Sequence, residues 1–287
     1  MLMIRLRVTL FYFSFLAWCS DVLPLRLALS LSTFQMLLTE QLHAAAFGGT
    51  SPLGRSIYNS PSFTSDALAA HVAERFVPAN MTLVGSGLPH AQLVEAGAAL
   101  FGSSNSSSLA PAAASPFVGG ASILPASADL THVALAFPGV ACDSPDFFAA
   151  QVFKQVLAAS SPCVGAFTVS YADEGLVGLA GAAGHAGASA LVSSMAASMK
   201  APVSDAAVAA AKLAVKTQLL VGAEDSSTLM AALAAGGLDQ GFKGIDAVTT
   251  ASVTALQSKM LKGGKLAMAT VGDASAVPAY DAVVKMF

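Results

Sequence analysis

Charged side chains are scarce in this sequence. They make up 11% of the 287 residues, against about 25% in a typical soluble domain. No arginine follows Arg75, and the formal net charge is −3. Proteins that bind nucleic acid neutralise phosphates with clustered lysine and arginine, so the composition argues against nucleic acid as a partner. Because 55% of the residues are hydrophobic, we expect other protein subunits to cover part of the surface.

Cysteine is nearly absent as well. The chain has Cys19, Cys142 and Cys163, and no two of them form a Cys-x-x-Cys pair. An odd, sparse set of this kind predicts reduced, buried thiols in a compartment that is not oxidising. It also argues against a structural zinc site.

No acidic residue precedes Asp21, and an uncharged run occupies residues 8–20 after Arg5 and Arg7. This run is too short to span a membrane as a helix. It suits the core of a signal peptide, a mitochondrial presequence, or translated intron or upstream sequence. We therefore assign residues 1–35 to a hydrophobic leader or to an artefact of the gene model.

Motifs for catalysis are missing. A zinc peptidase of the helical type needs two histidines on one helix face and a carboxylate that activates water. His71 and Glu74 form the one His-x-x-Glu of the sequence, and no second histidine follows them, so we expect an exposed helix face. No Gly-x-Ser-x-Gly is present, although a Ser-His-Asp group assembled in space stays open. The sequence predicts no catalytic, cofactor-binding or metal-ligating residue.

The remaining histidines lack ligand spacing, and we expect structural settings for them. We expect His43 to be hydrogen-bonded within a helix and His132 to lie on a strand. His90 and His185 are each expected at the start of a helix.

An internal repeat organises the chain. Residues 64–100 and 249–285 both show a helix pattern, a break, a short apolar strand and a second helix pattern. The two predicted strands, 81–84 and 266–269, are 185 positions apart, and nearly the same offset carries the helix around 39–47 onto 224–233. Three elements at one offset indicate a duplicated unit.

The two units differ in length. A Ser/Ala-rich stretch, 102–119, is typical of a flexible linker, and the second unit follows as 120–287. The elements that the two units share begin at about residue 34 in the first unit and about residue 219 in the second. About a hundred residues of the second unit precede that point, whereas only 33 residues of the chain precede it in the first. We therefore interpret 36–101 as the C-terminal part of an N-terminally truncated first unit.

Local patterns predict the elements of the second unit. Alternation and β-branched residues predict strands at 121–124, 132–137, 167–171 and 176–180. Apolar spacing predicts helices at 146–158, 183–200 and 204–220. The Gly/Ala-rich stretch 178–197 is interpreted as the end of a hairpin and a helix rather than a membrane span. Grouped strands and helices define an α+β fold with helices on one face of the sheet.

Several stretches resemble a known family. Leu-His-Ala-Ala-Ala-Phe at 42–47, followed by Pro-Leu-Gly-Arg-Ser-Ile at 52–57, resembles a segment of pitrilysin-type zinc peptidases and their mitochondrial relatives. The stretches 76–85 and 132–137 are similar to family segments, and 170–178 and 221–227 look closest to the core protein 2 branch. Over about 36–287, the chain resembles the family of mitochondrial processing peptidases and cytochrome bc1 core proteins. The resemblance implies duplicated sheet-plus-helix layers.

Two departures shape what the resemblance implies. The family's inverted His-x-x-Glu-His is absent, and the Gly-rich loop and helix expected between Leu157 and Phe167 look deleted, near 158–166. Both departures imply that the chain is not an enzyme and needs no cofactor.

The implied function is a non-catalytic, core-protein-like structural subunit of the cytochrome bc1 complex. Its partners would be other bc1 subunits. Its place would be the matrix side of the mitochondrial inner membrane, peripheral to the membrane. The alternative is a degenerate or incompletely represented subunit of the zinc-dependent mitochondrial processing peptidase, with zinc supplied by a partner subunit.

Overall fold

The computed structural model describes residues 34–56, 63–78, 81–102, 115–126, 129–160 and 164–287. Nearly all of the predicted leader, 1–35, and most of the predicted linker therefore lie outside the described residues. In chain order the elements are α3 (Phe34–Phe47), α4 (Ser65–Arg75), α5 (His90–Phe101), β1 (Gly120–Leu124), β2 (Leu130–Pro138), α6 (Phe147–Ser160), β3 (Gly165–Ser170), β4 (Gly175–Gly184), η2 (His185–Gly187), α7 (Ala188–Lys200), α8 (Asp205–Glu224), α9 (Ser226–Ala234), α10 (Leu238–Ala247), α11 (Thr250–Lys262), β5 (Ala267–Val271) and α12 (Tyr280–Val284).

One mixed sheet of five strands, in the order β1-β5-β2-β4-β3, forms the centre of the fold. β1 and β5 run parallel, with Gly120 opposite Ala267, and the other neighbours are antiparallel. The strands predicted at 121–124, 132–137, 167–171 and 176–180 are confirmed, and the fold class is α+β as predicted.

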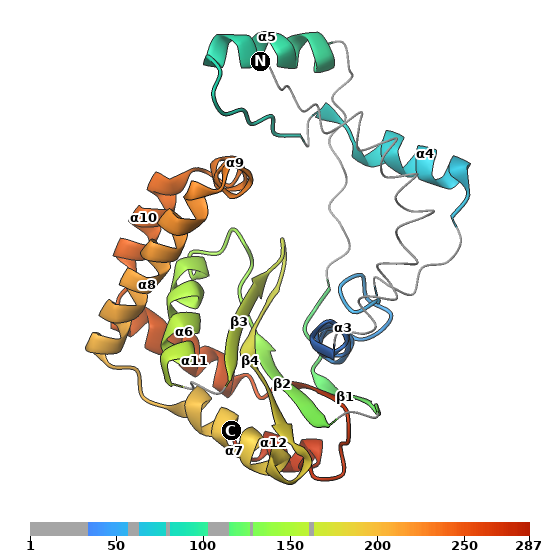
Figure 1. Cartoon of the computed structure of the whole chain (residues 1–287), viewed down its shortest axis with the longest axis vertical. Coiled ribbons are helices and arrows are strands. Elements are labelled where there is room, and N and C mark those ends of the chain that lie inside the picture. Colours follow the sequence, from blue (N-terminus) through green and yellow to red (C-terminus); the bar gives the residue numbers. More distant parts are fainter. Residues whose placement is uncertain (1–33, 57–62, 79–80, 103–114, 127–128, 161–163) are drawn as a thin grey trace.

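The two faces of the sheet carry side chains of different size. On β2, Val133, Leu135 and Phe137 point into the larger core, which α6, α7, α8 and α11 cover (Figure 1). The alternate residues Ala134 and Ala136 point to the opposite face and into a second core. Since successive strand residues face opposite sides, one strand supplies large residues to a helix layer and small residues to the other face.

Helix α3 covers part of the small-residue face. It packs on β1, β2 and β5, and its buried residues include Leu38, Leu42 and Phe47. Small side chains beneath it, such as Ala267 and Ala269, are fully buried and allow a close approach. Thus α3, which precedes the predicted linker, packs against the sheet, which follows that linker. The domain boundaries remain a prediction.

The chain just before β1 is packed rather than free. Ser115 is buried and its N–H donates to Asp173 at 2.9 Å. Phe117 packs edge-on against Phe47, with the ring centroids 6.1 Å apart. The N–H groups of Val118 and Gly119 both donate to the carbonyl of Ala46. Residues 115–119, predicted as linker, are therefore anchored to the end of α3.

The helix predicted from Ala183 begins too early. β4 continues to Gly184 because residues 180–184 pair with 130–134 of β2. A short 3-10 turn follows, and α7 starts at Ala188. Within β4, a Cβ at Gly178 would lie 2.1 Å from the carbonyl oxygen of Leu135, so close packing explains this glycine. The prediction of a hairpin end and a helix in 178–197 is confirmed.

In the predicted repeat, helices of the two units correspond in part, but the strands do not. Thr64 and Thr249, 185 positions apart, both cap a helix, and each hydroxyl accepts the N–H three residues later. By contrast, residues 81–84 form no strand, because β5 pairs with β1 and β2 and no described strand lies beside 81–84. That strand prediction is wrong. The glycines that follow the two stretches differ as well: Gly272 has φ 119°, whereas Gly85 is not left-handed.

Two helix predictions need corrected ends. The helix predicted at 224–233 is present as α9 but begins only at Ser226, because Asp225 ends α8 and caps α9 by accepting the Thr228 N–H at 2.8 Å. The second helix pattern within 249–285 becomes the short helix α12, Tyr280–Val284, since proline at 278 precedes it. Neither α4 nor α5 contains a buried residue, and both stand apart from the sheet and its helix layer (Figure 1).

Candidate functional site

His43 joins α3 to the sheet. Its Nδ1 donates to the Thr39 carbonyl at 2.7 Å, so its Nε2 is left to accept the Tyr171 hydroxyl at 2.6 Å. Burial raises the pKa of the Tyr171 hydroxyl, which keeps it protonated as the donor. The predicted hydrogen-bonded, structural role of His43 is thus met by a partner 128 positions away. Nothing in the sequence pointed to Tyr171 as that partner.

Beside this contact lies a groove of about 480 Å³, between α3 and the part of the sheet that α3 leaves uncovered. Its walls are mostly apolar, and the described residues that line it include no Lys, Arg, Asp or Glu. The lining residues are Gln35, Leu38, Thr39, Leu42 and His43 of α3, with His132, Ala134, Gly165, Ala166, Phe167, Val169, Ala180, Gly181 and Ala182 of the sheet. The groove exists because alanine and glycine side chains cannot fill the space above β4.

His132 is one of the residues that line the groove. It is on β2 as predicted, and its ring stacks on Phe34 with centroids 5.2 Å apart and planes 15° from parallel. Burial lowers the pKa of this imidazole, because removing water disfavours the charged form. The ring therefore acts as a neutral stacking surface for the start of α3.

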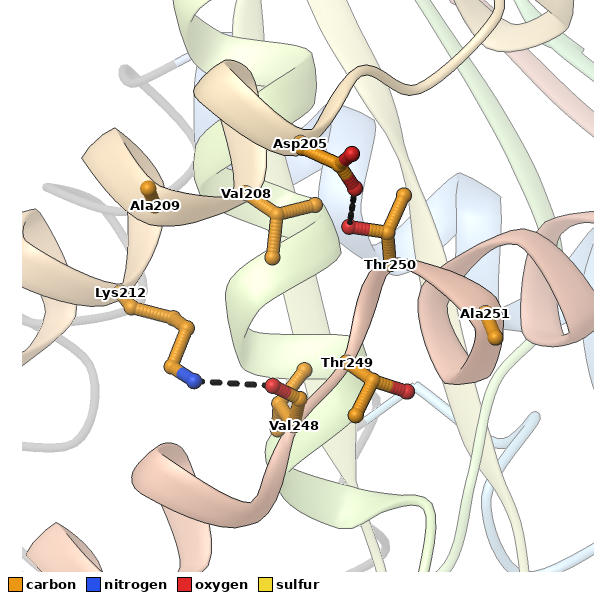
Figure 2. A pocket seen from close by; sticks show the side chains of 8 residues that line it. All are labelled: Asp205, Val208, Ala209, Lys212, Val248, Thr249, Thr250 and Ala251. Atoms are coloured by element: carbon orange, nitrogen blue, oxygen red, sulfur yellow. Dashed lines mark hydrogen bonds between the residues drawn. The ribbon is translucent and has the colours of Figure 1, made fainter.

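A second hollow, of about 470 Å³, lies where α8 meets the turn into α11 (Figure 2). Its polar groups are already engaged. Lys212 donates to the carbonyls of Asp246 and Val248 at 2.9 and 2.8 Å, and Asp205 accepts the hydroxyl of Thr250. These bonds connect α8 to the turn between α10 and α11. The polar groups of the hollow therefore have a structural role rather than a reactive one.

One Ser-His-Asp group does come together in space. His185 Nδ1 lies 3.3 Å from Asp273, and Ser275 Oγ is 3.5 Å from His185 Nε2. The Ser275 hydroxyl, however, donates to Asp273 at 2.6 Å, whereas a nucleophilic serine donates to the histidine. The bonds from Ser275 lower the pKa of Asp273. The side chains of His185 and Asp273 are about half exposed. We interpret the cluster as a set of contacts that stabilises the loop after β5.

The other candidates from the sequence are scattered. His71 and Glu74 lie on the exposed surface of α4, as predicted, and Glu74 pairs with Arg75 at 3.2 Å. His90 begins α5, but Pro89 is the cap and no side chain caps the helix. No group of three His, Cys, Asp or Glu side chains that could hold a metal occurs within the described ranges.

Cys142 corrects a prediction. It is exposed rather than buried, because it lies in the turn between β2 and α6, where its thiol donates to the Ser170 carbonyl. Cys19 and Cys163 lie outside the described residues. The α6–β3 connection, where a loop was expected to be deleted, runs from 161 to 164, and of these only Val164 is described.

α8 is the described helix that is long and apolar enough to cross a membrane. Core helices of packed proteins meet the same criterion. In α8, Val208, Ala211 and Val215 are buried, but only 17% of its apolar window is buried.

The fold agrees with the comparisons to known proteins. Residues 62–215 match the family described as the peptidase M16 inactive domain. The chain therefore belongs to the peptidase M16 family, which confirms the pitrilysin-type resemblance.

Two individual proteins are similar to this chain in sequence. Over 128 residues, the chain is 34% identical to mitochondrial-processing peptidase subunit alpha-2 of Dictyostelium discoideum, covering 43% of this chain and 28% of that protein. It is 25% identical over 298 aligned positions to mitochondrial-processing peptidase subunit alpha of Solanum tuberosum, covering 88% of this chain and 58% of that protein. The chain thus spans less than two thirds of either relative.

A solved structure shares the fold. A chain of complex III2 from Candida albicans, with Inz-5 bound, superposes with a TM-score of 0.80 at 16% identity, covering 93% of this chain and 73% of that chain.

Proposed function

We propose that this protein is a non-catalytic, core-protein-like structural subunit of the mitochondrial cytochrome bc1 complex. The observation that carries the proposal is the match of 62–215 to an inactive M16 domain, joined to a fold shared with a chain of complex III2. The histidines of the described chain support packing and loop contacts instead of a reactive centre. A surface with few charges suits a subunit that other chains cover.

In this proposal the chain sits on the matrix side of the inner membrane, peripheral to the membrane, and needs no cofactor. The sheet and α3 pack together, and apolar surfaces on α5 and α8 are available to neighbouring subunits. Among the exposed apolar side chains are Val94, Leu213 and Val221, which are 56%, 68% and 60% exposed.

A second candidate has its own support. The curated relatives are α subunits of mitochondrial processing peptidase, so the chain is alternatively a degenerate subunit of that zinc-dependent peptidase. There, a partner subunit would supply the metal.

Affinity purification of the tagged full chain from gently solubilised mitochondria separates the two candidates. Recovery of b- and c-type haem with the bait, in amounts comparable to the bait itself, supports the bc1 proposal. Recovery of presequence-cleaving activity without haem supports the alternative.

A further inference from the structure

The groove between α3 and the sheet is elongated along the strands. At one level Ala182 of β4 lies opposite His132 of β2, and at another Val169 of β3 lies opposite Leu176 of β4. Six positions of β4 separate these two levels, so at the usual rise of a strand the lining residues extend over about 20 Å. A volume of about 480 Å³ distributed over this length suits a slender occupant.

The middle of the groove is apolar. Ala180 lies between Ala134 and Gly165 on the neighbouring strands, and directly opposed residues of antiparallel strands share a face of the sheet. These small residues leave the space open, while Leu38 and Leu42 of α3 supply an apolar wall. A volume of this size is typical of the sites at which proteins bind small molecules, and the surface here suits a hydrocarbon chain.

Hydrogen-bonding groups that are still available lie at the Ala182 level. The ring of His132 stacks on Phe34, which covers a face of the imidazole and leaves both nitrogen atoms at its edge. No residue of the described chain is hydrogen-bonded to these nitrogens, whereas His43 uses both of its own. Burial lowers the pKa of His132, and a neutral imidazole offers one donor and one acceptor. The amide of Gln35, the residue after Phe34, also lines the groove.

The electrostatics of the groove select against a charged ligand. Neither a cation nor a carboxylate is found among the described lining residues. The head group of a fatty acid or of a quaternary amine would therefore lose water without gaining a partner of opposite charge. A hydroxyl group, by contrast, can donate to one nitrogen of a neutral imidazole or accept from the other.

We propose that this groove binds one molecule of a neutral, single-chain lipid, such as a long-chain alcohol or a monoacylglycerol. The alkyl chain lies along β3 and β4 over Ala180, and the hydroxyl head forms a hydrogen bond with His132. The stack on Phe34 holds the imidazole in position for this bond. Lipid binding is additional to the structural role proposed above and does not depend on which complex the chain joins.

The test uses the full chain at about pH 8, where the lowered pKa keeps His132 neutral. Isothermal titration calorimetry compares three probes with the same decyl chain: decanol, decanoate and decyltrimethylammonium. We expect one decanol to bind per chain, and the two charged probes to bind at least tenfold more weakly. From hexanol to decanol, the affinity should rise about fourfold for each added methylene, because each one is buried.

Variants of the chain locate the tail and the head of the ligand. Ala180→Phe fills the middle of the groove and should weaken decanol binding at least tenfold, whereas Ala210→Phe, on the exposed surface of α8, should not. His132→Phe keeps a ring against Phe34 but removes both nitrogens. It should weaken binding at least threefold and leave the gain per methylene unchanged. His90→Phe, at the exposed start of α5, is its control.

Four outcomes would overturn the proposal. The first is no saturable binding of decanol to the full chain. The second is equal affinity for the three decyl probes, since apolar surface alone would then account for the binding. The third is an equal loss of binding in Ala180→Phe and Ala210→Phe, which would place the lipid outside the groove. The fourth is tighter binding of decanoate than of decanol, which would identify an anionic ligand instead.

Discussion

The Nε2 atom of His43 and the hydroxyl of Tyr171 lie 2.6 Å apart, although 128 positions separate the two residues. This bond joins α3 to the turn between β3 and β4. It also explains the histidine of the Leu-His-Ala-Ala-Ala-Phe segment, whose leucine and phenylalanine are buried on either side of it. The segment is thus a packing motif for α3 on the sheet.

Removing the hydroxyl should weaken that attachment. Tyr171→Phe keeps the ring against Phe47, with which it makes an edge contact, and deletes the bond to His43. We expect the free energy of unfolding to fall by about 1 kcal/mol, measured by urea denaturation. In a double-mutant cycle, His43→Leu should add little in the Tyr171→Phe background. Full additivity of the two losses would show that the two side chains are not coupled.

The small-residue face beneath α3 should not tolerate larger side chains. Ala267 is fully buried under α3, so Ala267→Leu should cost about 1–3 kcal/mol of stability through overpacking. Ala182→Leu, at the exposed lip of the groove, is the matched control and should cost little. Equal thermal midpoints for both variants would contradict the close packing of α3.

Gln257 is a buried polar side chain with a clear structural task. Its amide donates to the carbonyls of Met199 and Ala201 at 2.8 and 2.9 Å, at the end of α7. Gln257→Leu should destabilise the fold by about 1–3 kcal/mol, because the buried carbonyls lose their donors. Gln155→Leu removes an exposed amide pair with Gln218 and should stay within about 0.5 kcal/mol. Chemical denaturation of both variants decides the point.

His132 should make stability depend on pH. Burial holds its folded-state pKa below the usual value of about 6.5. The unfolded chain therefore binds more protons as pH falls through that value, and stability drops. His132→Gln should flatten the curve of thermal midpoint against pH between about 7 and 5 relative to the wild type. Parallel curves for the two proteins would remove His132 as the cause.

Strands and the longer helices followed from local patterns. Alternation located 132–137 and 167–171, and the second helix pattern within 64–100 is found as α5, which begins at His90. These signals are local because each element is specified by its own apolar spacing. The candidate histidines were also placed on the correct kinds of element, apart from His185, which falls in a 3-10 turn.

What local patterns missed depends on distant partners. The stretch 180–184 has a composition that suits a helix, but pairing with β2 makes it strand. Residues 81–84 have the composition of β5 but lack the neighbours that make β5 a strand. The groove could not be foreseen, since it arises from alanines on two strands and from where α3 stops covering them.

The central proposal is membership of the bc1 complex, and native electrophoresis tests it most directly. Mitochondria that express the tagged full chain are solubilised in digitonin, and the gel is probed for the tag, for haem and for presequence-cleaving activity. The account predicts that the tag co-migrates with the haem-bearing band of complex III and is absent from the fractions that cleave presequences. Migration of the tag with cleaving activity, away from haem, would contradict it.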